Sequence, residues 1–410
     1  MKRLQYLFLV LFAYVVCSCE HDNDDPEPEK TPAHTLLIYM IGDNNLTSFC
    51  YQNVRSIEKG LLSTNEDINV VIYKDNKDSR PDETASLPEL FQLKKSFDKK
   101  THTTKIDTVY IERFNVDRNS CSIESIKEIV ELTFSTFNSD VKGLEFWGHG
   151  LSWIPQKEYK TKATRYIGFD EQGANGITAE NYIQIWDVRK ALESVPGLHL
   201  DYMMFDACNM ATAEVAYEFA GVSDYLLGAT TEILDAGFPY DTFIAALATC
   251  TSKSTLRNAL CCVCDEMQKR YPDYGTFSVI DNKNIEQLAN NYASMLKANA
   301  QKLEEIKLKA STIDKKLQHF GGPSTGSWYY IYDMEEFAKY LGTDISAEIS
   351  ASVARYYYAD SYVSLNSPLI PITNYCGIGV SIPELFGLAS SKDLANATYG
   401  LTKWGKKMGY

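Results

Sequence analysis

Cys208 and His149 are the two residues of this sequence whose positions suit nucleophilic chemistry. An apolar run, Tyr202–Phe205, precedes Cys208, and a helical pattern follows it directly. A cysteine at such a strand-to-helix junction lies near the N–H groups that begin the helix, and these favour the thiolate over the thiol. His149 also follows an apolar run, Gly143–Trp147, and lies between two glycines. Glycines there allow a substrate close to the backbone and leave an N–H available for an oxyanion.

Each of these two residues, taken alone, also has a structural explanation. Cys208 could be a small side chain in a tight turn, and His149 could be a polar residue in a glycine-rich turn. Both, however, stand at the carboxyl ends of strands that are consecutive in our interpretation, and right-handed crossovers would place them side by side. A Cys–His pair at that location has the geometry that nucleophilic catalysis requires.

The elements that must position this pair alternate between strand-like and helix-like segments. The predicted strands are Thr35–Ile41, Ile68–Tyr73, Ile106–Ile111, Gly143–Trp147, Asp201–Phe205 and Tyr225–Ala229. The predicted helices between them are Asn45–Leu62, Ser122–Phe137, Glu180–Val195 and Met210–Ala220. This alternation predicts an α/β fold, with a mostly parallel central sheet and helices on both faces. Catalytic groups of such sheets collect at the carboxyl ends of the strands.

The pattern changes from about residue 251 to longer helices. These are Thr255–Arg270, Lys283–Lys316 and Met334–Tyr340, and a late strand pair, Ser327–Tyr332 and Gly377–Ile382, interrupts them. We expect a catalytic domain over residues 33–250. Residues 251–410 would form a mainly helical C-terminal region that packs on the sheet.

Two motifs carry a specific family resemblance. Phe146–Gly150 and Met204–Cys208 resemble the paired His-Gly and Asp-Ala-Cys motifs of clostripain-type cysteine peptidases, relatives of caspases, gingipains and legumain. Supporting matches are Leu37–Met40, Gly42–Leu46 and Thr276–Asp281, so the resemblance spans about residues 35–281. One departure is Leu151–Ser152 before Trp153, where the family often has further small residues. This departure concerns the shape of the adjoining loop.

The resemblance implies a caspase-like fold and a cysteine endopeptidase that uses no cofactor. In its mechanism the Cys208 thiolate attacks the scissile carbonyl, and His149 assists proton transfer to the leaving amine. The backbone N–H groups of Gly150 and Cys208 would hold the tetrahedral oxyanion. The mechanism requires no third residue to orient the histidine, and the sequence offers no clear candidate for one.

The resemblance also implies a substrate preference. Clostripain-like enzymes cleave after Arg or Lys, which requires carboxylates in the pocket for that side chain. Asp206 matches the family's acid near this pocket, and Asp235 follows the next predicted strand as a second candidate. Two alternatives stay open: Asp206 could be a helix N-cap, and Asp235 could be an ordinary solvated loop acid.

A long basic loop follows His149. Residues 154–176 are long for a connection in a compact sheet, and such loops are usually functional or mobile. The loop carries Lys160, Lys162 and Arg165. Family members of this type are made as single chains and cut after a basic residue a short way beyond the histidine, which implies self-activation by cleavage after one of these residues, within the 155–170 loop. An ordinary solvated loop would account for the same charges.

The N-terminus predicts secretion. After a basic start, Leu4–Val16 is an uncharged run of 13 residues. This suits a signal peptide over residues 1–18 and is shorter than the roughly 20 residues of a membrane span. Val16–Cys19 resembles a bacterial lipobox, which implies a lipid on Cys19 and a lipoprotein of the outer membrane or cell surface. Residues 19–32 would form an acidic tether. An ordinary signal peptide with an incidental cysteine is the alternative.

The composition bears on the expected partners. The net charge is −14 and no basic stripe is present, so we expect no nucleic-acid partner. Cys261 and Cys264 would share a helix face, which makes a metal site conceivable. No histidine lies near them in sequence and small buried cysteines are commoner, so we expect no metal. We expect a monomer that acts on peptides or proteins containing Arg or Lys.

Three functions are compatible with these features. The first is an endopeptidase, made as a zymogen. The second is a catalytically silent caspase-like lipoprotein that binds peptides or cell-surface material, and the third is a transpeptidase with the same chemistry. The presence of both His149 and Cys208 favours an enzyme, because either residue could have been lost in a silent relative.

Overall fold

The computed structural model describes residues 32–77, 87–154, 167–171, 181–320, 331–363, 369–388 and 392–410. The predicted signal peptide, the lipidation candidate Cys19 and the tether up to residue 31 lie outside these described residues. So do the predicted processing residues Lys160, Lys162 and Arg165.

A nine-stranded sheet runs through the described part of the chain, in the order β10-β8-β7-β6-β5-β1-β2-β3-β4. Its strands are β1 (His34–Gly42), β2 (Asn69–Asn76), β3 (Glu89–Asp98), β4 (Thr103–Arg113), β5 (Val141–Trp147), β6 (Leu200–Asp206), β7 (Ser223–Gly228), β8 (Thr276–Asp281) and β10 (Val353–Tyr358). The inner strands β7, β6, β5, β1 and β2 are parallel, and antiparallel strands extend the sheet at both edges. The predicted mostly parallel α/β fold is confirmed.

The alternation of side chains along β1 shows why the sheet is buried on both faces. Leu37, Tyr39 and Ile41 belong to one hydrophobic cluster, whereas Leu36, Ile38 and Met40 belong to another. Successive side chains of a strand point to opposite faces, so a continuous apolar strand must be covered on both sides.

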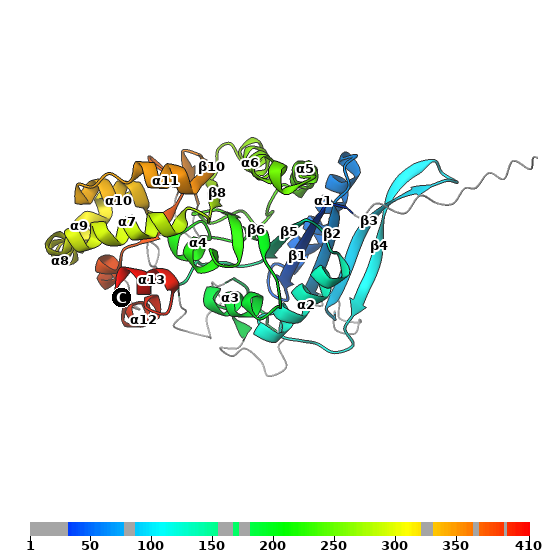
Figure 1. Cartoon of the computed structure of the whole chain (residues 1–410), viewed down its shortest axis with the longest axis horizontal. Coiled ribbons are helices and arrows are strands. Elements are labelled where there is room, and N and C mark those ends of the chain that lie inside the picture. The colour runs from blue at the N-terminus through cyan, green and yellow to red at the C-terminus, as the bar shows by residue number, and fades with distance from the viewer. Residues whose placement is uncertain are drawn as a thin grey trace, which may run out of the picture. The chain divides into compact units, whose positions relative to one another are not determined.

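Helices cover both faces of the sheet, as predicted (Figure 1). On the side of Leu37 lie α2 (Ile123–Thr136), α3 (Ile185–Glu193), α4 (Ala213–Phe219) and α7 (Ile285–Ala298), and on the side of Leu36 lie α1 (Thr47–Ser63), α5 (Tyr240–Ala248) and α6 (Lys253–Arg270). Helices α1 and α5 pack closely at Gly60, where a Cβ would lie 2.4 Å from the carbonyl oxygen of Tyr240. This contact holds the start of α5 against α1, which matters for the site described below.

The hairpin β3–β4 differs from the sequence-based expectation of one strand over residues 106–111. Its two strands pair antiparallel over most of their length. Only Leu90, Phe91 and Leu93 of β3 are buried, and β4 is largely exposed. The run of alternating apolar residues in β3 is therefore too short to predict a strand from the sequence.

The predicted long helix over residues 283–316 is also divided. It consists of α7, α8 (Ala300–Leu308), α9 (Ala310–Ile313) and a 3-10 helix, Asp314–Lys316. Asn299 separates the first two with non-helical dihedrals, and its side-chain amide donates to the carbonyl of Met295 at 2.9 Å. Asparagine forms such local side-chain bonds readily and so ends helices.

The C-terminal part of the chain joins the sheet as well as packing on it. Strand β8 pairs with β7, and β10 pairs with β8. The remaining elements are β9 (Ile331–Asp333), α10 (Met334–Leu341), α11 (Ser346–Ser352), β11 (Ser361–Tyr362), β12 (Ile370–Pro371), β13 (Gly379–Ser381), a 3-10 helix (Pro383–Leu388), α12 (Lys392–Tyr399) and α13 (Lys403–Met408). The predicted late strand pair is present, since β13 pairs antiparallel with β9. Residues 32–410 form one compact unit, and the boundary at residue 250 stays a prediction.

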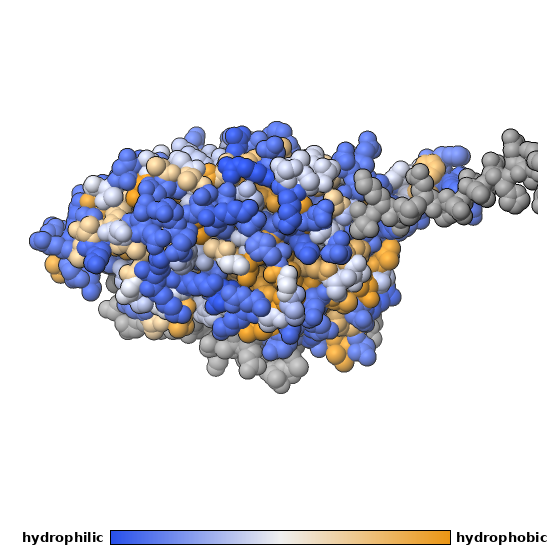
Figure 2. All heavy atoms as spheres, in the orientation of Figure 1, coloured by the Kyte–Doolittle hydropathy of each residue, from blue (hydrophilic) through white to orange (hydrophobic). Residues whose placement is uncertain are grey.

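One face of the molecule is mainly polar (Figure 2). Figure 2 shows one face that is largely hydrophilic, with smaller hydrophobic areas between charged side chains. Within the described ranges, no helix combines the length and the apolar character needed to cross a membrane.

Candidate active site

The ends of β5 and β6 bring the segments of His149 and Cys208 together. Trp147 of β5 is in register with Asp206 of β6, and the N–H of Gly148 donates to the carbonyl of Asp206 at 3.2 Å. His149 and Cys208 each follow their strand's paired residue by two positions. Both candidate residues therefore leave the same edge of the sheet from neighbouring strands.

Gly150 shows how closely the two segments approach. A Cβ at this position would lie 2.7 Å from the Cβ of Ala207 and 2.7 Å from the carbonyl oxygen of Cys208. It would also lie 3.1 Å from the backbone nitrogen of Cys208. Contacts this short are not tolerated, so only glycine permits the observed packing of the His149 loop on the Cys208 turn.

The segment after Cys208 corrects one sequence-based expectation. A helix does not begin directly after the cysteine: α4 begins at Ala213, with Thr212 as its N-cap. Residues 207–211 form a turn in which Asn209 has a φ of 62° and donates through its side-chain amide to the carbonyl of Thr230 at 2.7 Å. Asparagine tolerates this left-handed conformation better than most residues, which explains the early break in the helical pattern.

The N–H group that reaches the thiol comes from a different element. The backbone N–H of Ile233, in the loop after β7, donates to Cys208 Sγ at 3.4 Å. A hydrogen bond to the sulfur stabilises negative charge on it. The N–H group that stabilises a thiolate at Cys208 therefore comes from the loop between β7 and α5, whereas the sequence had predicted that it comes from the start of a helix.

Asn45 is a residue of the site that the sequence analysis missed. His149 Nε2 lies 2.9 Å from Asn45 Oδ1, and an amide oxygen can only accept, so Nε2 carries a proton. Asn45 follows β1, the strand next to β5, and the neighbouring Asn44 is anchored by bonds to the carbonyls of Ile41 and Phe169. The family resemblance of Gly42–Leu46 pointed to this segment, but nothing in it singled out Asn45.

Asp206 is a buried acid at the end of β6, two residues before Cys208. It is 2% exposed, and its Oδ2 accepts from the N–H of Phe238 at 3.0 Å and from the Tyr240 hydroxyl at 2.7 Å. Its Oδ1 is buried and has no hydrogen-bond partner among the described residues. The N-cap explanation of Asp206 is wrong, because the residue belongs to β6 and Thr212 caps α4.

Gly237 lies against both Asp206 and Asn53. A Cβ there would lie 2.6 Å from Asp206 Oδ2 and 2.9 Å from Asn53 Oδ1, and the φ of Gly237 is 70°. Asn53 comes from α1, and its Oδ1 is also buried without a partner in the described part of the chain. The side chains of Asp206 and Asn53 thus approach Gly237 together, and each carries one buried oxygen without a donor among the described residues.

Asp235 lies in the same loop as Ile233 but is exposed. It contributes to the electrostatics at longer range. Burial first, and then the charges of Cys208, Glu232 and Asp235, raise the pKa of Tyr274. Asp235 is therefore within electrostatic reach of the residues around the thiol, although Asp206 is the buried acid.

The loop after the His-Gly motif is ordered by buried contacts at the position where the family resemblance was weaker. Ser152 has a φ of 52° and bonds Thr212 through its hydroxyl at 2.8 Å. Trp153 is fully buried, and its Nε1 donates to Ser381 at 2.9 Å. The C-terminal strand β13 thus supports the His149 loop.

Comparison with known proteins identifies the family. A sequence model of the clostripain family matches residues 38–367, which is most of the chain. The chain belongs to the clostripain family. It is therefore a cysteine-type peptidase.

Solved structures agree with this peptidase in fold. An inactive zymogen of a C11 protease from Parabacteroides distasonis is 24% identical, with a TM-score of 0.74 over 92% of this chain and 99% of that one. A secreted C11 cysteine protease from Bacteroides thetaiotaomicron, in complex with an irreversible peptide inhibitor, is 21% identical, with a TM-score of 0.70 and the same coverage. No curated protein sequence matches the chain.

The cysteines of the peptidase outside the site belong to the core or surface. Cys264 is buried in the hydrophobic cluster of α1, α5 and α6, whereas Cys262 is exposed. Within the part of the chain that the structure describes, no group of three or more His, Cys, Asp or Glu is arranged to hold a metal ion.

Tyr240 connects Asp206 of the peptidase to a second buried acid, Glu145. The Tyr240 hydroxyl hydrogen-bonds both Asp206 Oδ2 and Glu145 Oε1. A hydroxyl has one proton to donate, so both contacts are satisfied only if one carboxyl is protonated. Burial, and then the charge of Asp206, raise the pKa of Glu145 well above its usual range, whereas burial raises the pKa of Asp206 to about 7. Glu145 therefore holds the proton and donates it to Tyr240, which donates to Asp206.

Glu145→Gln tests this proton assignment. The folded protein keeps the Glu145 proton at pH values where the unfolded chain, with a pKa near 4.5, releases it. The free energy of unfolding of the wild type should therefore fall as the pH rises above that value, by about 1.4 kcal/mol per pH unit from this group. The Gln variant lacks this contribution, so its stability relative to the wild type should increase with pH in urea denaturation at pH 5, 6 and 7. Parallel pH dependences of the two proteins would show that Glu145 is ionised.

Proposed function

We propose that this peptidase is an endopeptidase that cleaves after Arg or Lys, with Cys208 as nucleophile and His149 as the proton donor to the leaving amine. The observation that carries the proposal is the position of Asp206. A buried carboxyl ends β6 two residues before Cys208, and one of its oxygens has no partner within the described residues.

The reaction follows from the roles of the pair. The Cys208 thiolate attacks the scissile carbonyl, and the carbonyl oxygen becomes an oxyanion. Since Asn45 occupies the Nε2 side of His149, Nδ1 is the nitrogen that exchanges a proton with the leaving amine. The N–H groups of Gly150 and Cys208 lie on the two touching segments and would hold the oxyanion. Losing one such donor costs about 3–4 kcal/mol in comparable sites.

Asp206 would recognise the basic side chain before the scissile bond. A guanidinium or ammonium group supplies the donors that Asp206 Oδ1 and Asn53 Oδ1 lack. Charge-assisted hydrogen bonds of this kind are stronger than neutral ones. Asp235, exposed in the neighbouring loop, would add negative potential at longer range.

The location and activation of the enzyme extend the proposal. A signal peptide and a lipid on Cys19 would hold the peptidase at the outer membrane or cell surface. Residues 19–32 would serve as a tether, and cleavage in the 155–170 loop would convert a zymogen into the active enzyme.

Cys208→Ala and His149→Ala test the catalytic pair. Each should lower kcat/KM on an Arg-containing fluorogenic peptide by about ten-thousand-fold, because the two residues act as one unit. The double variant should be no worse than the single variants by more than about tenfold. Cys262→Ala, which removes an exposed thiol, is the control and should keep wild-type activity. Wild-type turnover in Cys208→Ala would contradict the assignment.

Asp206→Asn tests the specificity. It should lower kcat/KM for Arg and Lys peptides by about 10- to 100-fold, the range of a lost charged hydrogen bond. In the wild type, protonation of Asp206 below its pKa of about 7 removes the attraction, so use of these peptides should rise with pH through that value. At each pH, kcat/KM is divided by the rate of thiol alkylation. Since both rates depend on the ionisation of the catalytic pair, this dependence cancels in the ratio. The ratio should lose its pH dependence in Asp206→Asn. A preference for Asp or for large apolar residues before the scissile bond would dismiss the proposal.

Self-cleavage after Lys160, Lys162 or Arg165 is tested by mass spectrometry of the purified wild type beside Cys208→Ala. A chain of 46.3 kDa over 410 residues would give fragments of about 16 and about 28 kDa after removal of the signal peptide. The fragments should appear in the wild type alone. Equal fragments in both proteins would indicate a contaminating protease, and a fully active uncut chain would contradict activation by cleavage.

A further inference from the structure

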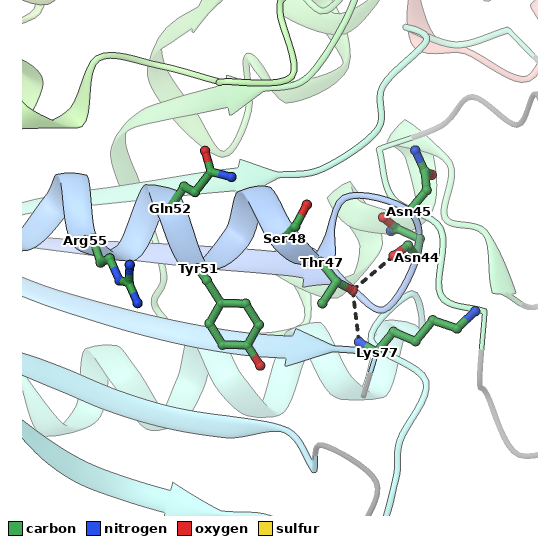
Figure 3. Close-up of a pocket in the computed structure, with 8 residues that line it drawn as sticks. All are labelled: Asn44, Asn45, Thr47, Ser48, Tyr51, Gln52, Arg55 and Lys77. Atoms are coloured by element: carbon green, nitrogen blue, oxygen red, sulfur yellow. Dashed lines mark hydrogen bonds between the residues drawn. The ribbon is translucent and has the colours of Figure 1, made fainter. Parts of the chain in front are cut away.

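A pocket of about 620 Å³, lined by polar and charged residue types, opens beside the residue that bonds His149. Its lining includes Asn45, Ser48, Tyr51, Gln52 and Arg55 from the turn after β1 and from α1, together with Lys77, which follows β2. Figure 3 shows these side chains along α1 and at the end of β2. We call this space the α1 pocket.

The order of the strands places the α1 pocket on one side of the catalytic pair. The sheet runs β7-β6-β5-β1-β2, and all five strands are parallel, so their carboxyl ends share one edge. Cys208 follows β6 and His149 follows β5, whereas the pocket lies at the ends of β1 and β2. Asp206 ends β6 and lies between the loop after β7 and Asn53 on the buried side of α1, whereas Gln52 and Arg55 of the pocket lie on the exposed side of α1.

In the proposed function, a bound peptide would cross the catalytic pair from Asp206 towards the α1 pocket. Its basic side chain would reach Asp206, its scissile carbonyl would face Cys208, and its leaving amine would face His149. The segment after the scissile bond then continues from β5 towards β1 and β2. Neighbouring strands are about 4.8 Å apart and an extended chain rises about 3.3 Å per residue, so two to three residues span this distance.

We propose that the α1 pocket binds the second or third residue after the scissile bond and selects an acidic side chain there. This inference rests on the proposed peptidase site and adds a requirement on the leaving side of the substrate. The chemistry of the lining is the reason for the choice of an acid.

Among the described residues, the lining of the α1 pocket includes two cations, Arg55 and Lys77, and no acid. Lys77 pairs with Glu171, whereas Arg55 makes no ion pair with any described residue. Lys74 lies over the Tyr51 ring, 5.4 Å from its centroid, and pairs with Glu89 at 3.2 Å. The guanidinium of Arg55 is therefore the positive charge left for a ligand, and it matches a carboxylate in bidentate geometry.

Neutral groups of the lining support the same ligand. The amide of Gln52, the hydroxyl of Ser48 and the hydroxyl of Tyr51 are donors for a carboxylate. A lysine at this position of the substrate would be repelled by Arg55.

Binding to the inactive Cys208→Ala protein tests the proposal without requiring turnover. Fluorescent peptides would share one Arg and differ only in Asp, Gln or Lys at the second and third positions after it. The Asp peptide should bind about three- to tenfold more tightly than the Lys peptide, as expected for a partly exposed charge pair. Adding Arg55→Glu should abolish or reverse this order.

Lys59→Glu is the matched control, because Lys59 is exposed on α1 one turn beyond Arg55 and does not line the pocket. It makes the same change of charge and should keep the preference for Asp. Equal binding of the three peptides to the Cys208→Ala protein, or an equal effect of Lys59→Glu and Arg55→Glu, would overturn the assignment of the pocket.

The same peptides with the catalytic cysteine present separate this inference from the proposed function. Cleavage after Arg at equal rates for Asp and Lys peptides would contradict the α1 pocket while supporting the peptidase. A binding preference for Asp that depends on Arg55, without cleavage after Arg, would support the pocket and contradict the proposed specificity.

Discussion

The close contact between Gly150 and the backbone of Cys208 is the constraint on which the site depends. Parallel strands β5 and β6 are in register up to Trp147 and Asp206. Beyond these residues both segments leave the sheet, and they must stay in contact as they do so. Any side chain at position 150 would push the His149 loop away from the Cys208 turn. The glycine therefore does two things at once. It keeps the two candidate catalytic segments in contact, and it leaves a backbone N–H next to that of Cys208.

The buried acids Asp206 and Glu145 show how a negative charge can be stabilised inside a protein. Burial disfavours the charged form of every carboxyl, and two buried carboxyls near one another cannot both ionise readily. Here Tyr240 connects Glu145 to Asp206, so that one proton held by Glu145 stabilises the charge on Asp206 through the hydroxyl. Asp206 Oδ1 is buried without a donor among the described residues, so part of the desolvation cost of this carboxyl is not offset. The donors of a basic ligand would offset it. In the proposed function, stability and recognition are therefore in opposition at Asp206.

The sequence allowed much of this arrangement to be predicted, because the inner strands are buried on both faces and are therefore continuous apolar runs. Their order along the chain and the right-handed crossover were sufficient to expect His149 near Cys208. The β3–β4 hairpin could not be found in the same way, since edge strands are half exposed and their apolar pattern is short. The turn at Asn209 was missed because a helical pattern does not reveal where a left-handed residue delays the first turn.

The sequence by itself determined the family, the fold class and the candidate pair, because motifs that end adjacent strands are local and leave their residues in order along the chain. Only the tertiary structure decided which other groups meet them. Asn45 reaches His149 from β1, the N–H of Ile233 reaches Cys208 from the loop after β7, and Asn53 of α1 lies near Asp206 at Gly237. These contacts join segments far apart in the chain, and their geometry depends on how helices α1 and α5 pack on the sheet. No spacing in the sequence encodes such distances, so they follow from packing alone.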